Sequence, residues 1–273
     1  MNVLSLFDGI SCGMVALQRA GIKVDRYNKT WMECRKSPDN KTENRRSLMN
    51  SLVYAPSGGG KTVCSTMVAA PNRGKNLLLC SDNSHIVLNN KEFQRPNLTI
   101  EVVEHWLDKD IDGNPQQCFI KQFEEAVDSK QYDNIIVDNI SDMFDMAILE
   151  FDESGRVKDP RQYYLIVYQA LKRLARKAAQ VDCNVIFTAW TDLQNITLPG
   201  GEHVTRIQPK LPNKILDNFL GLTQIVAYIT SAEHNGVRKW YYALNGSPTL
   251  YAKDQAFNRK SCLPENIFNG GNK

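Results

Sequence analysis

The residues with the clearest chemical signature form a glycine-rich segment, residues 55–62 (APSGGGKT), directly after the apolar run SLVY. Three successive glycines let the backbone turn without Cβ clashes, so that several N–H groups can point toward one anion. A helix that begins at Lys61 would add the positive end of its dipole to the same place. The segment therefore predicts a loop that binds phosphate groups between a strand and a helix.

The lysine and threonine at the end of the segment have distinct chemical roles in such a loop. Lys61 can reach the β- and γ-phosphates of a nucleotide, and the Thr62 hydroxyl can ligate Mg²⁺. One residue departs from the usual pattern G-x-x-x-x-G-K-[ST], because Ala55 stands where that pattern has its first glycine. The alternative is a flexible turn before a helix whose lysine is solvated. The residues expected to bind the nucleotide are Ala55, Pro56, Ser57, Gly58, Gly59, Gly60, Lys61, Thr62 and Val63.

A carboxylate ends a second apolar run, Ile135-Ile136-Val137-Asp138. Ligands of open α/β sheets bind at the carboxyl ends of the strands, so Asp138 should face the same crevice as Thr62. We expect it to hold Mg²⁺ together with that hydroxyl. The alternative is an aspartate that caps the strand by bonding to backbone.

The residue that orients the attacking water is less clearly marked. Asp82 follows the apolar run LLLCS, and Thr188 lies near the end of NVIFTAW. Glu101 and Glu104, near a further expected strand, are rivals for the carboxylate role. For each of them a polar strand end that faces solvent is an equally good interpretation.

The elements that must position these residues follow from alternating apolar runs and helical patterns, which indicate an α/β domain with a mainly parallel central sheet. An Asp159-Pro160 pair is a strong helix start. Residues 235–236 (Asn-Gly) suit the turn of a hairpin. The expected strands are residues 51–55, 75–81, 98–103, 134–139, 184–190, 224–230 and 239–244, and the expected helices begin near residues 61, 116 and 160.

Composition is that of an ordinary globular protein: 273 residues, 42% hydrophobic and 23% charged, with a net charge of +3. The seven cysteines are scattered and form no C-x-x-C pair, which argues against a zinc ribbon or a disulfide framework. No apolar run approaches the ~18 residues that a membrane helix needs. We expect a cytoplasmic protein without a membrane partner.

Four segments in this order and spacing, YAPSGGGKT, LLLCSD, NIIVDN and NVIFTAW, resemble the RecA-like P-loop ATPases of phages, some of which are single-strand annealing recombinases. The resemblance implies a RecA-like P-loop NTPase core over residues 47–260 that binds and hydrolyses ATP with Mg²⁺. It also implies single-stranded DNA as a partner, self-association into a ring or filament, and a phage or prophage origin in a bacterial host. By the same resemblance Asp82 takes the position of the catalytic carboxylate, and Lys253, or second Arg238, that of a basic finger offered to a neighbouring subunit.

The first 27 residues resemble something else, the opening motif of DNA cytosine-5 methyltransferases, in which Phe7, Gly9 and Gly13 would shape the turn beside S-adenosylmethionine. No Pro-Cys nucleophile dipeptide occurs in the chain. We therefore expect residues 1–27 to be a short amino-terminal appendage, followed by a linker (28–46), the ATPase domain (47–260) and a tail (261–273). A methyltransferase-related protein that binds S-adenosylmethionine is the alternative function.

Two regions are candidates for contact with DNA. The expected helix over residues 161–180 carries several lysines and arginines, although a basic helix face is most often simply solvated. Residues 191–214 contain a Gly-Gly pair and three prolines, and we expect a long loop there. Because long loops in compact domains are commonly functional, this loop is the favoured DNA-contacting segment.

Overall fold

The computed structural model describes residues 48–69, 74–234 and 237–270. The expected appendage (1–27) and linker (28–46) lie outside the described residues. Residues 47–273 form one compact unit, and the fold below is that of this unit. No helix in the described part of the chain has the length and apolar character to span a bilayer.

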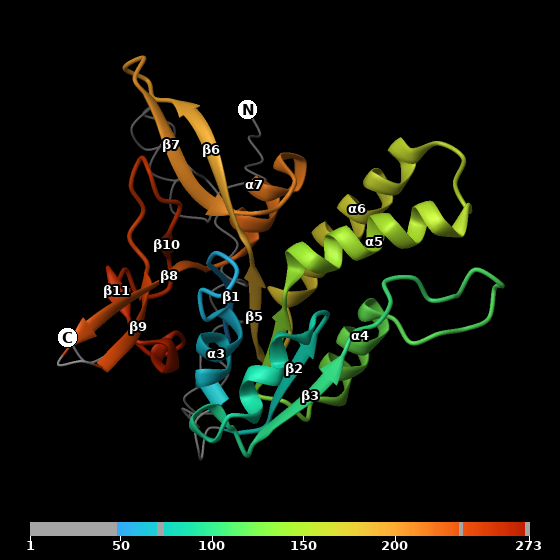
Figure 1. Cartoon of the computed structure of the whole chain (residues 1–273), viewed down its shortest axis with the longest axis horizontal. Helices are drawn as coiled ribbons and strands as arrows, with labels where there is room; N and C mark the ends of the chain where they lie inside the picture. The colour runs from blue at the N-terminus through green and yellow to red at the C-terminus, as the bar shows by residue number, and fades with distance from the viewer. Residues whose placement is uncertain (1–47, 70–73, 235–236, 271–273) are drawn as a thin grey trace, which may run out of the picture. The chain divides into compact units, whose positions relative to one another are not determined.

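A nine-stranded sheet runs through the centre of the unit (Figure 1). Its strands are β1 (Asn50–Tyr54), β2 (Asn76–Cys80), β3 (Leu98–Val102), β4 (Asn134–Asp138), β5 (Asn184–Ala189), β8 (Ile225–His234), β9 (Val237–Ala243), β10 (Lys253–Asp254) and β11 (Ser261–Cys262). The order is β11-β9-β8-β1-β5-β4-β2-β3, with β10 beside β8. The strands from β8 to β3 in this order run parallel, and β9, β10 and β11 pair antiparallel. The expected α/β fold with a mainly parallel sheet is confirmed.

Helices cover both faces of this sheet. The helices are α3 (Lys61–Thr66), α4 (Phe119–Ser129), α5 (Ile140–Ser154), α6 (Pro160–Ala178) and α7 (Asn213–Leu222), with 3₁₀ turns η1 (Met67–Ala69), η2 (Asn83–Asn89), η3 (Lys91–Phe93) and η4 (Pro264–Asn266). One core joins the sheet to α4, α5, α6 and α7. The other joins it to α3, η1 and η2. The glycine-rich segment thus leads into α3, which lies on the opposite face of the sheet from α4, α5, α6 and α7.

The central strands are mainly apolar because both of their faces are covered. In β2, Leu77 and Leu79 enter the core under α4 to α7, whereas Leu78 enters the core under α3. All three are fully buried. Unbroken apolar runs in the sequence therefore correspond to the inner strands.

Two long helices begin with side-chain caps that position them. The Asp159 carboxylate accepts from the Arg161 backbone N–H at 3.0 Å, and Pro160 opens α6, as the sequence predicts. Helix α5, which the sequence analysis missed, begins behind Asn139, whose side-chain oxygen accepts from the Asp142 N–H at 2.7 Å. Asn139 directly follows the last residue of β4, so α5 starts at the carboxyl edge of the sheet.

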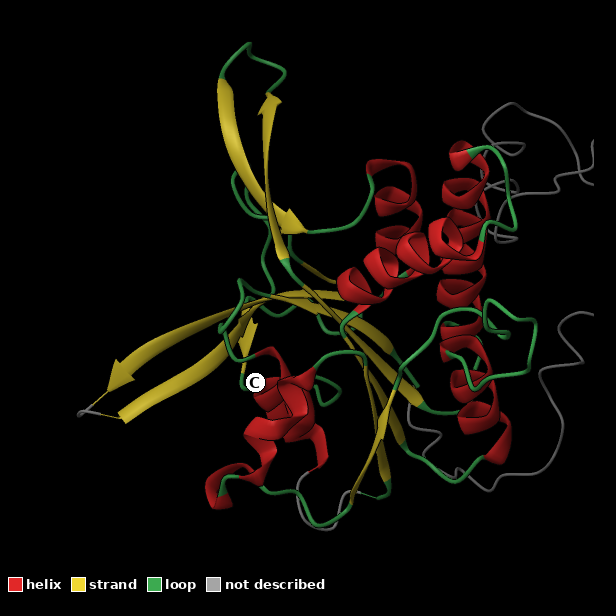
Figure 2. Ribbon diagram, turned by 45° about the vertical axis from the view of Figure 1, so that its right-hand side comes forward, coloured by secondary structure: helices red, strands yellow, loops and turns green. Residues whose placement is uncertain are grey.

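The prediction of a long loop over residues 191–214 is wrong. Strands β6 (Thr191–Thr197) and β7 (His203–Pro209) pair along their whole length in a hairpin of their own. This hairpin is one of two strand pairs that project from the body of the unit in Figure 2, and α7 follows it. Strand pairing satisfies the backbone of a segment that would otherwise be a long unpaired loop, and Gly201, with φ +85°, supplies the turn.

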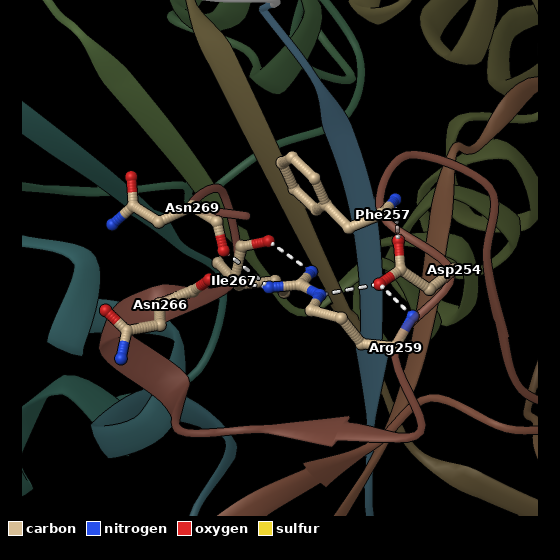
Figure 3. Close-up of polar contacts among 6 residues, drawn as sticks. All are labelled: Asp254, Phe257, Arg259, Asn266, Ile267 and Asn269. Carbon is tan, nitrogen blue, oxygen red and sulfur yellow. Dashed lines mark hydrogen bonds and ion pairs between the residues drawn. The ribbon is translucent and has the colours of Figure 1, made fainter. Parts of the chain in front are cut away.

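Residues 261–270, expected to form a tail, pack against the sheet. Strand β11 pairs with β9, and Ile267 is fully buried. The Arg259 guanidinium holds this segment: it bonds the Asp254 carboxylate at 2.6 Å and donates to the backbone oxygens of Asn266, Ile267 and Asn269 at 2.8–2.9 Å (Figure 3). Because Asp254 is buried, its charge depends on this arginine.

We predict that Arg259→Met lowers the free energy of unfolding by about 3 kcal/mol, since it leaves the Asp254 carboxylate buried without its partner. Chemical denaturation of both chains measures the difference. The matched control is Arg161→Met, which breaks an ion pair of the same kind with Asp159 on the surface and should change stability by under about 0.5 kcal/mol. Equal losses in the two variants would contradict the prediction.

Candidate nucleotide site

The glycine-rich loop connects β1 directly to α3, and its glycines are needed where they stand. Gly58 and Gly60 have φ values of +71° and +84°, which favour glycine. Gly59 has no room for a side chain, because a Cβ there would lie 2.7 Å from the Ala55 Cβ and 2.9 Å from the Pro56 oxygen. The loop backbone therefore makes a tight turn at the carboxyl end of β1, where Gly58, Gly59 and Gly60 could not carry side chains without strain or clash.

Lys61 turns back over this loop. Its side-chain nitrogen donates to the backbone oxygens of Pro56 at 3.1 Å and Ala55 at 3.4 Å. Burial lowers the pKa of this ammonium, while the nearby carboxylates of Asp138 and Asp82 act in the opposite direction. The Lys61 ammonium is thus held at the loop by two neutral carbonyls, and an ammonium has a third N–H that can donate to an anion.

Asp138 lies at the end of β4 and is 1% exposed. Its carboxylate accepts hydrogen bonds from three hydroxyls: Thr62 of α3 at 2.5 Å, Ser84 of η2 at 3.0 Å, and Thr188 of β5 through a short contact. The structure therefore brings the expected pair Thr62 and Asp138 into direct contact. It also places Thr188, one of the open alternatives, in the same cluster.

Burial raises the pKa of Asp138 despite this cluster. Removal of water from the carboxylate is the largest cause, the hydroxyls of Thr188 and Thr62 lower the pKa, and the charge of Asp82 raises it further. A positive charge that binds close to such a buried carboxylate stabilises its ionised form. That is the electrostatic condition of a cation site.

Asp82 lies beside this cluster. Its carboxylate accepts from the Ser84 backbone N–H at 2.9 Å and from the Asn139 side-chain nitrogen at 3.2 Å. In the described part of the chain, no hydrogen bond or ion pair joins Glu101 or Glu104 to the loop or to Asp138. Of the three carboxylates weighed for the catalytic role, Asp82 is the one next to Asp138. Ser84 and Asn139 were not singled out from the sequence.

The two candidates for a basic finger lie on the other side of the loop. Lys253 belongs to β10, pairs with Val226 of β8, and donates to the Gln255 side-chain oxygen at 3.3 Å. Arg238 donates to the Ser231 hydroxyl at 3.0 Å. Neither makes a hydrogen bond to the glycine-rich loop of its own chain.

The donor set suits a magnesium nucleotide. Mg²⁺ takes oxygen ligands and is usually held by one or two protein side chains together with phosphate oxygens, rather than by a cage of side chains. The Thr62 hydroxyl and the Asp138 carboxylate supply such oxygens side by side. Lys61 and the loop backbone supply the donors that a phosphate chain needs.

The raised pKa of Asp138 makes a prediction about stability. The folded chain holds a proton on this carboxyl more tightly than the unfolded chain does, so folding stability falls as pH rises through the folded pKa. Asp138→Asn removes this loss, and the three hydroxyls can rotate to accept from the new amide. We expect the variant without ligand to be at least as stable as the wild type at pH 7, with a weaker decline of stability between acidic and neutral pH.

Urea unfolding over a series of pH values, without nucleotide or metal, measures how the free energy of unfolding changes with pH in the wild type and in Asp138→Asn. Asp145→Asn is the control, because that carboxylate is half exposed and pairs with Lys210 on the surface. A variant at Asp138 that is less stable than the wild type at pH 7, with an unchanged slope, would show that burial of this charge carries no cost.

Comparison with known proteins agrees with this geometry. A family described as "AAA domain" matches residues 49–256, which include the loop, Asp82, Asp138 and Thr188. A search of curated proteins finds no match.

Two solved structures are similar in outline. A KaiC-like protein from the archaeon Pyrococcus horikoshii is 14% identical with a TM-score of 0.39, and the match covers 71% of this chain and 76% of that one. The flagellar accessory protein FlaH from Methanocaldococcus jannaschii is 15% identical with a TM-score of 0.41, covering 82% and 91%. At such values a likeness assigns no activity. Because the family match spans well over half of the chain, this protein belongs to the AAA domain family.

Proposed function

We propose that this chain binds and hydrolyses ATP with Mg²⁺ and uses the reaction to act on single-stranded DNA, in phage recombination or annealing. The observation that carries the ATPase part is the contact between Thr62 of the loop and the buried Asp138 carboxylate, with Lys61 beside it. The DNA part rests on the resemblance of the four sequence segments to phage RecA-like proteins. The methyltransferase alternative rests on residues outside the described part of the chain.

The roles of the chain's own residues follow from their positions. Lys61 and the loop backbone would bind and orient the phosphate chain, and Thr62 with Asp138 would hold the metal that accompanies it. Bound Mg²⁺ would neutralise the charge that develops on the phosphate oxygens. Asp82, hydrogen-bonded to Asn139 and close to Asp138, would orient a water molecule. Thr188 fixes the Asp138 carboxylate from β5.

Self-association is part of the proposal because, in the described part of the chain, Lys253 and Arg238 make their side-chain hydrogen bonds to Gln255 and Ser231 rather than to the glycine-rich loop. Lys253 is half buried on β10, where burial lowers the pKa of its ammonium. In a ring or filament, this lysine would be offered to the nucleotide of the next chain.

The first prediction concerns ATP turnover. The wild type hydrolyses ATP only with Mg²⁺, and single-stranded DNA raises the rate. Lys61→Ala binds ATP at least about tenfold more weakly, because it loses a charge-assisted bond to phosphate. Asp138→Asn lowers Mg²⁺-dependent turnover at least about tenfold. Calorimetry measures the binding and phosphate release measures the rate.

Lys121→Ala is the control for the first variant, since Lys121 is exposed on α4, across the sheet from α3. Unchanged ATP binding in Lys61→Ala would overturn the ATPase proposal. A rate that is the same with and without excess single-stranded DNA would overturn the DNA part and leave the ATPase part standing.

The second prediction concerns the finger. Lys253→Ala should bind ATP as the wild type does but hydrolyse it about tenfold more slowly. A mixture of Lys253→Ala and Lys61→Ala chains should regain activity, because each supplies what the other lacks. Wild-type turnover by Lys253→Ala alone would remove this lysine from the mechanism, and lost turnover without recovery in the mixture would exclude action between chains.

A further inference from the structure

A tryptophan from β9 closes one side of the glycine-rich loop. A Cβ on Gly60 would lie 2.8 Å from the indole nitrogen of Trp240 and 3.3 Å from its Cε2. Gly60, with φ +84°, immediately precedes Lys61. The half-buried indole is therefore in contact with the backbone that would receive phosphate.

The indole N–H is available to a ligand. Within the described residues no hydrogen-bond acceptor is found for this group. A tryptophan N–H that is taken out of water normally has a partner. Binding of a molecule in the loop would remove water from the indole and leave the N–H pointing at that molecule or at the loop itself.

Strand order fixes which part of a nucleotide lies near Trp240. The strands β5 and β4, which carry Thr188 and Asp138, flank β1 on one side, and β8 and β9 flank it on the other. A nucleotide whose terminal phosphate and metal lie by Asp138 must extend its other end away from β4. Trp240 lies in that direction, beyond the loop.

The surroundings of the indole suit a planar, electron-rich ring. The Phe93 ring of η3 meets it edge-on, with centroids 6.3 Å apart and an interplanar angle of 73°. The Arg238 guanidinium lies 5.7 Å from the indole centroid. Aromatic side chains of this kind bind nucleobases by stacking, and a nearby arginine strengthens the contact.

We propose that Trp240 contacts the nucleoside part of the bound nucleotide, with its ring against the base and its N–H donating to a base or ribose acceptor. The proposal rests on nucleotide binding by the loop and adds the residue that distinguishes a nucleotide from a bare phosphate chain. Phe93 keeps the indole in place from the side.

Two ligands separate this role from simple support of the loop. ATP carries a nucleoside, whereas inorganic tripolyphosphate offers the same phosphate chain without one. Trp240→Ala should weaken ATP binding about tenfold and leave tripolyphosphate binding unchanged. Trp240→Phe, which keeps a ring but loses the N–H, should fall between the wild type and Trp240→Ala. Calorimetry with Mg²⁺ present gives the affinity of each of the three chains for each of the two ligands.

Tyr241→Ala is the matched control, because it truncates an aromatic residue of the same strand that faces the opposite side of the sheet from Trp240. It should bind ATP as the wild type does. Thermal melting shows whether each variant is folded, and ATP should change the tryptophan fluorescence of the wild type more than that of Trp240→Phe, which keeps the proposal testable if Trp240→Ala does not fold.

Unchanged ATP affinity in both Trp240 variants, or equal weakening of ATP and tripolyphosphate, would overturn the nucleoside contact while leaving the loop function intact. If the wild type binds neither ligand, the proposed function itself fails. The two failures are therefore distinguishable.

Discussion

The layout of the site depends on one buried carboxylate. Asp138 lies at the end of β4, and its side chain is almost completely buried. A charge that is buried in this way is costly unless it is paired or hydrogen-bonded. Three hydroxyls satisfy it, and they come from three separate elements: α3, η2 and β5. The parallel order of β1, β5 and β4 is what lets these elements meet at one edge.

The same carboxylate links the fold to the proposed chemistry. Hydrogen bonds alone do not offset its burial, so its pKa stays raised and the site gains from a cation. The charge of Asp138 reaches the Lys61 ammonium and raises its pKa, but this ammonium is held by loop carbonyls rather than by Asp138 itself. In the proposed function the two charges remain apart because they serve different partners, one the metal and the other the phosphate chain.

Much of this could be predicted from the sequence. Unbroken apolar runs locate the inner strands because both faces of each strand are buried, and Asp159-Pro160 locates α6 because its capping chemistry is local. Thr62 and Asp138 could be paired because parallel strands end at a common edge. These are features that one segment, or one simple rule of topology, determines.

Other features were not predicted, most of them because they depend on partners distant in the chain. Ser84 and Asn139 become part of the site only when η2 and α5 begin beside β4. The β6–β7 hairpin was missed because its Pro-Gly-Gly turn and polar strands were interpreted as a loop, although the pairing partners are close in sequence. The role of Trp240 could not be predicted either, because its contact with Gly60 exists only since β9 lies two strands from β1.

We expect Thr62 and Asp138 to complete a metal site when a nucleotide occupies the loop. Mn²⁺, an oxygen-ligated stand-in for Mg²⁺, reports on this directly through its electron paramagnetic resonance signal in a titration with ATP. We predict one tightly held Mn²⁺ per chain in the presence of ATP, lost on Asp138→Asn while ATP itself stays bound. Tight Mn²⁺ binding of equal strength in the wild type and in Asp138→Asn would contradict the account.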